Sequence, residues 1–287
     1  MALDIGVIAL VLLAAVLHAA WNALVKSGGD RLVVLALVMV TPGLLAALAL
    51  PFVTPPEPAS WPFLLASVLI HYLYYGALFW AYEHGDLSQV YPIARGSAPL
   101  LVALGAWLLA GEALNGAEWL GVLVVSLGIV SLAWRRGGWR AAAWRDGELK
   151  AVGFALLTGL TIAGYSVSDG MGVRRAGSEL GYILWLLAGE TPVIIAWTLW
   201  RRRGRWRSAF TPYLRRGIFG GILTGTAYGI VIWCMSLGPM AHIVALRETS
   251  VLIAAAIGTL LLKEPFGRHR IAAATVVAAG AVLLNVG

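Results

Sequence analysis

Residues 85–132 read "GDLSQVYPIARGSAPLLVALGAWLLAGEALNGAEWLGVLVVSLGIVSL", and this stretch decides the fold because the chain contains a second version of it. The second version, residues 238–284, reads "GPMAHIVALRETSVLIAAAIGTLLLKEPFGRHRIAAATVVAAGAVLL". A shift of 152 residues places Arg95 on Arg247. The same shift aligns Glu112 with Glu264 and Gly128 with Gly280. Similarity over such a length indicates a duplicated structural unit.

The composition identifies the class of protein. Hydrophobic residues make up 60% of the 287 residues, charged residues only 12%, and the mean hydropathy is +0.83. Soluble domains average about 45–50% apolar and 25% charged residues, so we expect an integral membrane protein. A helix needs about 20 apolar residues to cross the bilayer. Ten runs meet this requirement: 3–25, 32–52, 61–82, 88–110, 117–134, 149–169, 179–200, 213–236, 240–262 and 268–286.

The first run is longer than the apolar region of a signal peptide, so we expect it to remain in the mature protein. The connections between runs are too short for a catalytic or nucleic-acid-binding module. No phosphate-binding glycine loop, metal-ligand spacing or nucleophile–base pair stands out, so we expect no enzyme activity and no cofactor. The expected partners are a small-molecule substrate and membrane lipids, with no nucleic acid, and the chain is expected to be a monomer or a homodimer.

The basic residues predict the orientation in the membrane. Of the 21 lysines and arginines, 17 lie in the odd-numbered connections or within the first four residues of the span that follows, whereas the even-numbered ones hold only Arg174 and Arg175. By the positive-inside rule, the odd connections face the cytoplasm of a bacterial-type inner membrane and both termini face outward. The remaining two basic residues, Arg95 and Arg247, lie inside predicted spans.

An odd number of helices per unit means that the two units enter the membrane in opposite senses. We therefore predict an all-α integral membrane protein with ten transmembrane helices arranged as two inverted five-helix repeats. The first repeat is expected at 1–134, a basic cytoplasmic linker at 135–148, and the second repeat at 149–287. Inverted repeats are typical of secondary carriers, although a membrane enzyme or a channel can also be duplicated.

Several motifs resemble one family of carriers. Each unit has an apolar helix, then a turn with Gly111-Glu112 or Lys263-Glu264, then a glycine-containing last helix. Together with "LHAAWNALVKSGGDR" (17–31) and "YPIARGSAPLLVALGAWLLAGEAL" (91–114), this pattern resembles the EamA-type members of the drug/metabolite transporter superfamily over nearly the whole chain. The resemblance implies transport of small metabolites through a cavity lined mainly by the first, third, fourth, sixth, eighth and ninth spans. Such carriers are more often drawn with both termini in the cytoplasm, whereas the loop charges here predict the opposite.

Arg95 and Arg247 are the main candidates for a substrate site. An arginine deep in the bilayer costs about 2.5–3.5 kcal/mol on insertion scales, so it normally faces protein, a partner or a ligand. Snorkelling to the headgroups is the alternative, but recurrence in both repeats favours a functional pair. At helical spacing, Tyr91 shares a face with Arg95, and Ser250 shares a face with Arg247. We predict that these residues bind an anionic group.

Other polar residues inside the spans are further candidates. His18 and Asn22 form a stripe on the first span with Trp21 beside it, and Tyr165 belongs to a stripe on the sixth span that ends at Asp169. Packing between helices explains such stripes equally well. Tyr75 and Tyr228 are favoured as cavity walls because the repeat aligns them.

Two acidic residues, Glu190 and Glu248, also lie inside spans. A buried carboxylate has to be paired or protonated, because burying an unpaired charge is costly. Each is therefore predicted to be a proton-coupling group, a partner for a substrate amine, or the charge partner of an arginine.

These residues favour a secondary transporter that moves a small anionic or zwitterionic metabolite across the inner membrane by alternating access. The substrate class would be amino-acid-like, a carboxylate, or a phosphonate or phosphate. An exporter of organic cations or drugs with an acidic and aromatic site is the alternative, and a multispan lipid-modifying enzyme is a third.

Overall fold

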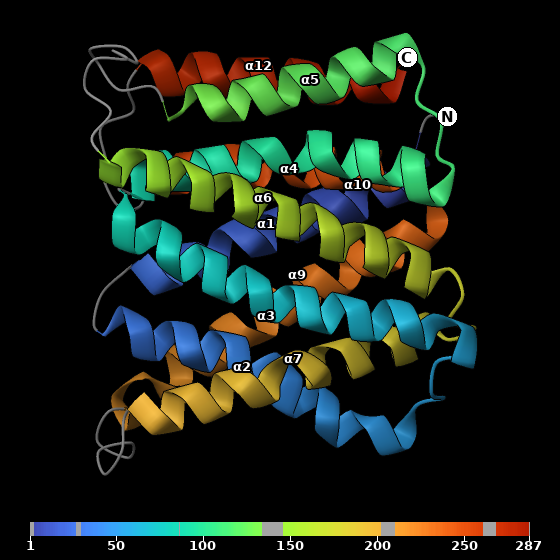
Figure 1. Cartoon of the computed structure of the whole chain (residues 1–287), viewed down its shortest axis with the longest axis vertical. Helices are drawn as coiled ribbons and strands as arrows, with labels where there is room; N and C mark the ends of the chain where they lie inside the picture. Colours follow the sequence, from blue (N-terminus) through green and yellow to red (C-terminus); the bar gives the residue numbers. More distant parts are fainter. Residues whose placement is uncertain are drawn as a thin grey trace.

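The computed structural model describes residues 3–26, 30–85, 87–133, 146–201, 210–260 and 268–286, and within these ranges every regular element is a helix (Figure 1). The longer helices are α1 (Ile5–Lys26), α2 (Arg31–Ala49), α3 (Trp61–His84), α4 (Leu87–Ala110), α5 (Gly116–Ser131), α6 (Asp146–Val173), α7 (Glu179–Arg201), α9 (Leu214–Leu237), α10 (Met240–Arg247), α11 (Ser250–Leu260) and α12 (Arg268–Val286). Short 3₁₀ turns occupy Leu50–Phe52, Pro58–Ser60 and Thr211–Tyr213.

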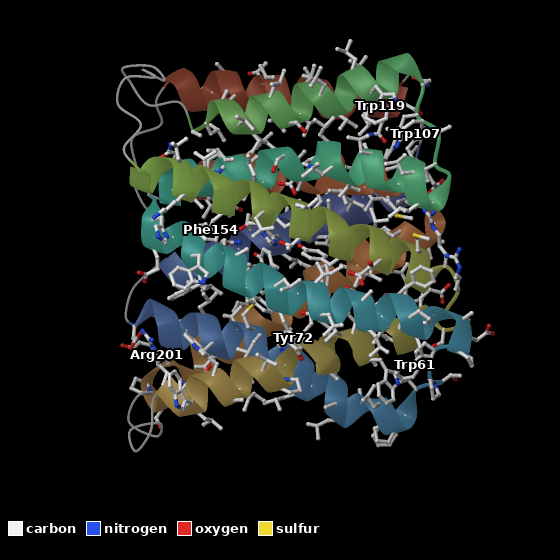
Figure 2. All side chains as sticks on the ribbon, viewed as in Figure 1. Trp61, Tyr72, Trp107, Trp119, Phe154 and Arg201 are labelled. Atoms are coloured by element: carbon white, nitrogen blue, oxygen red, sulfur yellow. The ribbon has the colours of Figure 1, made fainter. Side chains whose placement is uncertain are left out.

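The helices have the properties of membrane spans. Seven of the described helices are long and apolar enough to cross a bilayer, and α5 and α12 are shorter apolar helices. Leucines such as Leu48, Leu73 and Leu109 are more than half exposed on the outside of the bundle, as lipid contact allows. Figure 2 places Trp107 and Trp119 near one end of the bundle and Phe154 near the other, where aromatic rings meet the membrane interface. The chain is therefore a multi-pass, all-helical membrane protein.

The helices lie side by side in layers (Figure 1). At one edge α5 packs against α12, and at the other α2 packs against α7. Between these pairs, α6 packs against α3 and α4, while α1 packs against α9, α10 and α11. The first helix begins and the last helix ends at the same end of the bundle (Figure 1).

Close helix packing depends on small residues, because lipid provides no hydrophobic force to hold helices together. A Cβ atom added at Gly280 would lie 2.8 Å from the backbone nitrogen of Val125, so α12 can approach α5 only with glycine there. The glycine face of α9 meets α2 in the same way, since a Cβ atom at Gly225 would lie 2.6 Å from the Cβ atom of Pro42. This small-residue face is therefore a contact within the chain.

The structure divides the single helix predicted over 240–262. Helix α10 ends at Arg247 and α11 begins at Ser250. Between them the Glu248 amide is shared between the carbonyls of residues 244 and 245, and the Thr249 amide bonds the carbonyl of residue 246. The Thr249 hydroxyl donates to that same carbonyl. The backbone hydrogen bonds thus change from i→i−4 to i→i−3 beside Arg247 and Glu248, a geometry found at hinges and functional sites.

Candidate functional site

One buried ion pair joins the two halves of the chain. The Arg95 Nε atom on α4 donates to Glu248 Oε2 at 3.0 Å, and Arg95 Nη2 lies 2.8 Å from Glu248 Oε1. The side chains are only 8% and 0% exposed. Glu248 occupies the tightened turn between α10 and α11, so this turn directs the carboxylate toward α4. The positive charge of Arg95 is therefore neutralised inside the protein.

The second arginine, Arg247, has a different environment. Its guanidinium lies over the Tyr228 ring, with 5.7 Å between Cζ and the ring centroid, and the residue is buried. Among the residues that the structure describes, no carboxylate forms an ion pair with it. One turn further on, the Ser250 hydroxyl is buried and has no hydrogen-bond partner within the same part of the chain. Arg247 therefore contacts aromatic residues, Tyr165 and Tyr228, but has no anionic partner among the described residues, and the Ser250 hydroxyl is left for another group.

Two buried carboxyl groups, Asp169 on α6 and Glu190 on α7, lie near Tyr228. Asp169 accepts hydrogen bonds from the Tyr182 and Tyr228 hydroxyls, at 3.2 and 2.5 Å. Glu190 accepts one from the Tyr75 hydroxyl at 3.3 Å, and its other oxygen lies 3.4 Å from His71 Nε2. Tyr228 therefore contacts both Arg247 and Asp169, linking the cation to the carboxyl groups.

Aromatic rings surround His71 at the centre of this group. The Tyr165 ring stacks on it with centroids 4.0 Å apart, and Tyr74 and Tyr228 approach it edge-on. The Tyr228 hydroxyl lies 3.3 Å from His71 Nε2. Tyr72 of the same helix donates to the Gly189 carbonyl and so fixes α3 against α7 beside Glu190 (Figure 2).

The stripe on α1 is largely satisfied by its own helix. The Trp21 Nε1 atom donates to His18 Nδ1 at 3.3 Å, and the Asn22 amide donates to the His18 carbonyl at 2.8 Å. His18 nevertheless lies within electrostatic range of Arg95 and Arg247. On α4, Tyr91 is half-buried one turn before Arg95 and interacts electrostatically with it. These residues therefore border the two arginines without bonding to the carboxyl cluster.

Sequence reasoning did not select two residues of the cluster, His71 and Asp169. The predicted sixth span stopped at Asp169, whereas α6 continues to Val173 and buries Asp169 completely. His71 carries a usable sequence signal, because it shares a helix face with Tyr75. Within the described residues, no cluster of His, Cys, Asp and Glu side chains could hold a metal ion.

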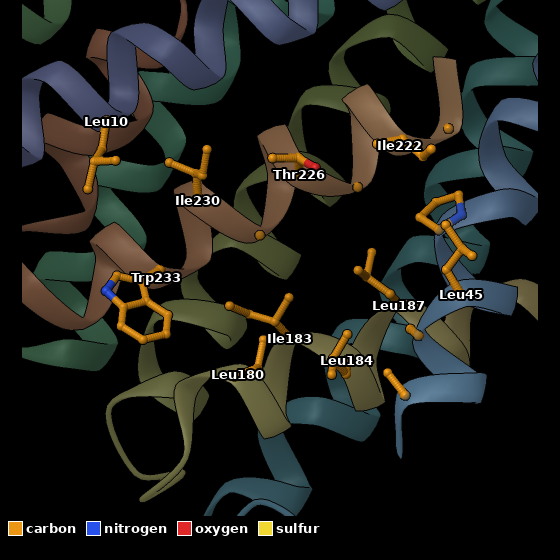
Figure 3. A pocket seen from close by; sticks show the side chains of 16 residues that line it. Leu10, Leu45, Leu180, Ile183, Leu184, Leu187, Ile222, Thr226, Ile230 and Trp233 are labelled. Atoms are coloured by element: carbon orange, nitrogen blue, oxygen red, sulfur yellow. The ribbon is translucent and has the colours of Figure 1, made fainter. Parts of the chain in front are cut away.

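An apolar cavity of about 600 Å³ lies between α1, α2, α7 and α9 (Figure 3). In Figure 3, Leu184 and Leu187 of α7 face Ile222, Thr226 and Ile230 of α9. Its lining contains no charged side chain. This cavity can take apolar groups, and it is distinct from the charged cluster.

Comparisons with known proteins place the chain in a family. No curated protein matches it. A solved structure described only as "Crystal structure of protein" is similar with a TM-score of 0.79 and 17% sequence identity, covering 98% of this chain and 96% of that one, which shows a shared fold. The model of the EamA-like transporter family matches residues 5–134 and again 149–286, which confirms the resemblance seen in the motifs. Since this match spans nearly the whole sequence, the chain belongs to the EamA-like transporter family and is a membrane transporter.

Proposed function

We propose that this transporter is a secondary carrier for a small zwitterion that bears a carboxylate and an ammonium group, such as an amino acid. The observation that carries the proposal is a pair of buried donors on either side of the turn between α10 and α11: Arg247, which no carboxylate of the described residues pairs with, and the Ser250 hydroxyl, which has no hydrogen-bond partner among them. A guanidinium can bind a carboxylate through two parallel hydrogen bonds. A buried cation without an anionic partner is costly, so a substrate carboxylate at Arg247 would be favourable.

The ammonium group would bind at Asp169. This carboxyl group bonds the Tyr228 hydroxyl, and Arg247 lies over the ring of the same tyrosine, so we propose that one small molecule reaches both charges. The tyrosine rings around it also suit a cation, because aromatic faces attract positive charge. Arg95, Tyr91, Tyr75, Tyr165, His18, Trp21 and Asn22 are proposed to complete the walls, with Glu248 keeping Arg95 in place.

We propose that transport occurs by alternating access between two inverted five-helix repeats. The packing pairs support this symmetry: α6 packs against α3 and α4, and α1 packs correspondingly against α9, α10 and α11. The pairs α2 with α7 and α5 with α12 join equivalent helices. In this scheme α10 and α11 together form the ninth of ten crossings. The basic connections face the cytoplasm, and both termini face outward from the inner membrane.

The acidic and aromatic residues also favour a second candidate, an exporter of organic cations. In that case Asp169 and Glu190 would bind the cation and the two arginines would have no ligand role. The two candidates differ in whether a substrate carboxylate is required, and this difference can be measured directly.

The test uses thermal stabilisation of the purified protein by L-alanine, L-leucine, L-methionine, L-phenylalanine and L-threonine, because a ligand selective for the folded state raises its stability. Each is compared with its N-acetyl and C-amide derivatives. We expect at least one amino acid to bind and both of its blocked forms to bind at least about tenfold more weakly, equivalent to about 1.4 kcal/mol.

The matched variants are Arg247→Met and Arg216→Met, because Arg216 is an exposed arginine on α9. Binding should be lost in the first and retained in the second, and uptake into proteoliposomes should follow the same pattern. Binding of the C-amide as tight as that of the free amino acid would instead support the organic-cation exporter. Unchanged binding in Arg247→Met would refute the carboxylate site.

A further inference from the structure

The hydrogen bonds around His71 define its tautomer. His71 Nδ1 lies 2.9 Å from the Ser67 carbonyl oxygen, which can only accept. Nδ1 therefore carries a hydrogen and donates it. In a neutral imidazole the other nitrogen, Nε2, is then an acceptor.

Two oxygens face His71 Nε2. The Tyr228 hydroxyl, at 3.3 Å, has its hydrogen directed to Asp169, as its 2.5 Å contact with that carboxylate shows. Glu190 Oε1 lies at 3.4 Å, is buried, and has no hydrogen-bond donor within the described part of the chain. An ionised Glu190 beside a neutral His71 would thus bring two acceptors together without a hydrogen between them. Such an arrangement is repulsive, and burial makes it more so.

We propose that Glu190 and His71 form a proton-binding site that holds one proton in this closed arrangement, and that this proton is the coupling ion of the carrier. The proton lies between Glu190 Oε1 and His71 Nε2, whether it is bonded to the carboxyl or to the imidazole. The role as coupling ion rests on the proposed carrier function, whereas the occupied proton site follows from the local geometry.

The surrounding charges support a single proton. Arg95 is neutralised by Glu248, and Asp169 accepts from two tyrosines, one of which, Tyr228, has Arg247 over its ring. With one proton shared by Glu190 and His71, the buried charges of this centre balance. The other titratable or charged groups that face the site are Tyr72, Tyr74 and Tyr75 from α3, Tyr165 and Asp169 from α6, Tyr182 from α7, Tyr228 from α9 and Arg247 from α10.

Loss of the proton would separate α3 from α7 at this point. Glu190 would carry an uncompensated buried charge facing an acceptor, and solvation would lower that cost. The contact would then open to water, which lets the proton leave on one side of the membrane and be replaced on the other. This connects proton binding to the rearrangement that alternating access requires.

The first experiment needs no substrate. Purified wild-type protein and the variants Glu190→Gln and Glu179→Gln are titrated potentiometrically from near-neutral to alkaline pH. Gln places an amide donor opposite His71 Nε2 and so imitates the protonated state without a titratable proton. We expect Glu190→Gln to release one proton fewer than wild type. Glu179 lies on the same helix outside this cluster, so Glu179→Gln should match wild type. Equal proton release by wild type and Glu190→Gln would overturn the proton site.

The second experiment tests coupling in proteoliposomes with the five amino acids named above. Glu190→Gln should still exchange labelled for unlabelled amino acid, because exchange needs only the substrate-loaded carrier in its proton-bound form to reorient, whereas proton-driven accumulation also needs the proton to leave. An imposed pH gradient should change the steady-state accumulation in wild type and Glu179→Gln, and should have no effect in Glu190→Gln. An equal response of Glu190→Gln and wild type to the gradient would overturn the coupling role. Loss of amino-acid binding in Arg247→Met tests the substrate assignment separately.

Discussion

Replacing one partner of the buried Arg95–Glu248 pair should destabilise the protein far more than replacing both partners. At a separation of about 4 Å and an effective dielectric constant of about 20, two unit charges attract by about 4 kcal/mol. Both side chains are buried and are joined by one hydrogen bond and one close charge contact, so a single substitution leaves one charge without compensation. Removing one partner of such a pair costs about 3–5 kcal/mol, whereas replacing both by apolar groups of similar volume is close to neutral.

We therefore expect Arg95→Met and Glu248→Met each to lower the free energy of unfolding by about 3–5 kcal/mol, and the double variant to lie near wild type. The stability of Arg95→Lys should lie between that of wild type and that of Arg95→Met, because a lysine keeps the charge but loses the planar guanidinium that makes two contacts with Glu248. The assay is equilibrium unfolding in mixed detergent micelles, followed by tryptophan fluorescence and circular dichroism. The double-mutant cycle isolates the coupling between the two residues.

A double variant as unstable as the sum of the two single variants would refute this reasoning, since the two residues would then act independently. Single variants within about 1 kcal/mol of wild type would refute it as well, because the pair would then behave like a solvent-exposed one.

Three further predictions concern the ends of the helices and their packing. Glu112 accepts hydrogen bonds from Arg174 Nη2 at 2.6 Å and from the first amide of α10 at 2.9 Å. Glu112→Ala should therefore destabilise the protein by about 1–3 kcal/mol and speed hydrogen exchange at that amide. Unaltered exchange would contradict the role of Glu112 in capping α10. Gly111 has a φ of 70°, which strains any residue with a side chain, so Gly111→Ala should lower the stability by about 1–2 kcal/mol in a thermal unfolding series. Gly116→Ala is the control, because the new Cβ atom has open space around it. Equal effects of the two substitutions would contradict backbone strain at position 111. Gly280→Ala should cost about 1–3 kcal/mol by forcing α12 away from α5, and a neutral result in the same series would show that the helices can shift without loss.

Much of the fold was predictable because it depends on local properties of the chain. The starts and ends of most spans agree with the sequence prediction within a few residues, since an apolar run of fixed length is needed to cross a bilayer. The ninth span was wrong because nothing in its apolar run signals a turn at Glu248 and Thr249, where shared and shortened hydrogen bonds interrupt the helix. Helix α6 continues past the predicted end at Asp169 to Val173, because two tyrosines satisfy the aspartate inside the bundle.

The candidate site was only partly predictable. Arg247 and Glu248 are neighbours in the sequence, but neighbouring residues on a helix do not face each other. Glu248 instead pairs with Arg95, 153 residues away in the chain. His71 illustrates the same limit, since its role depends on partners from α7 and α9 as well as on its own helix.

The amino-acid sequence alone shows that the chain is a duplicated, helical membrane protein with two arginines at equivalent places, because hydrophobic run length and internal similarity are properties of the linear chain. Which charges neutralise each other, and which do not, depends on the folded structure. Charge pairing depends on the rotation and approach of helices from distant parts of the chain. Arg95 and Arg247 are equivalent in the repeat, but in the packed helices Glu248 pairs with Arg95, whereas Arg247 lies over the Tyr228 ring.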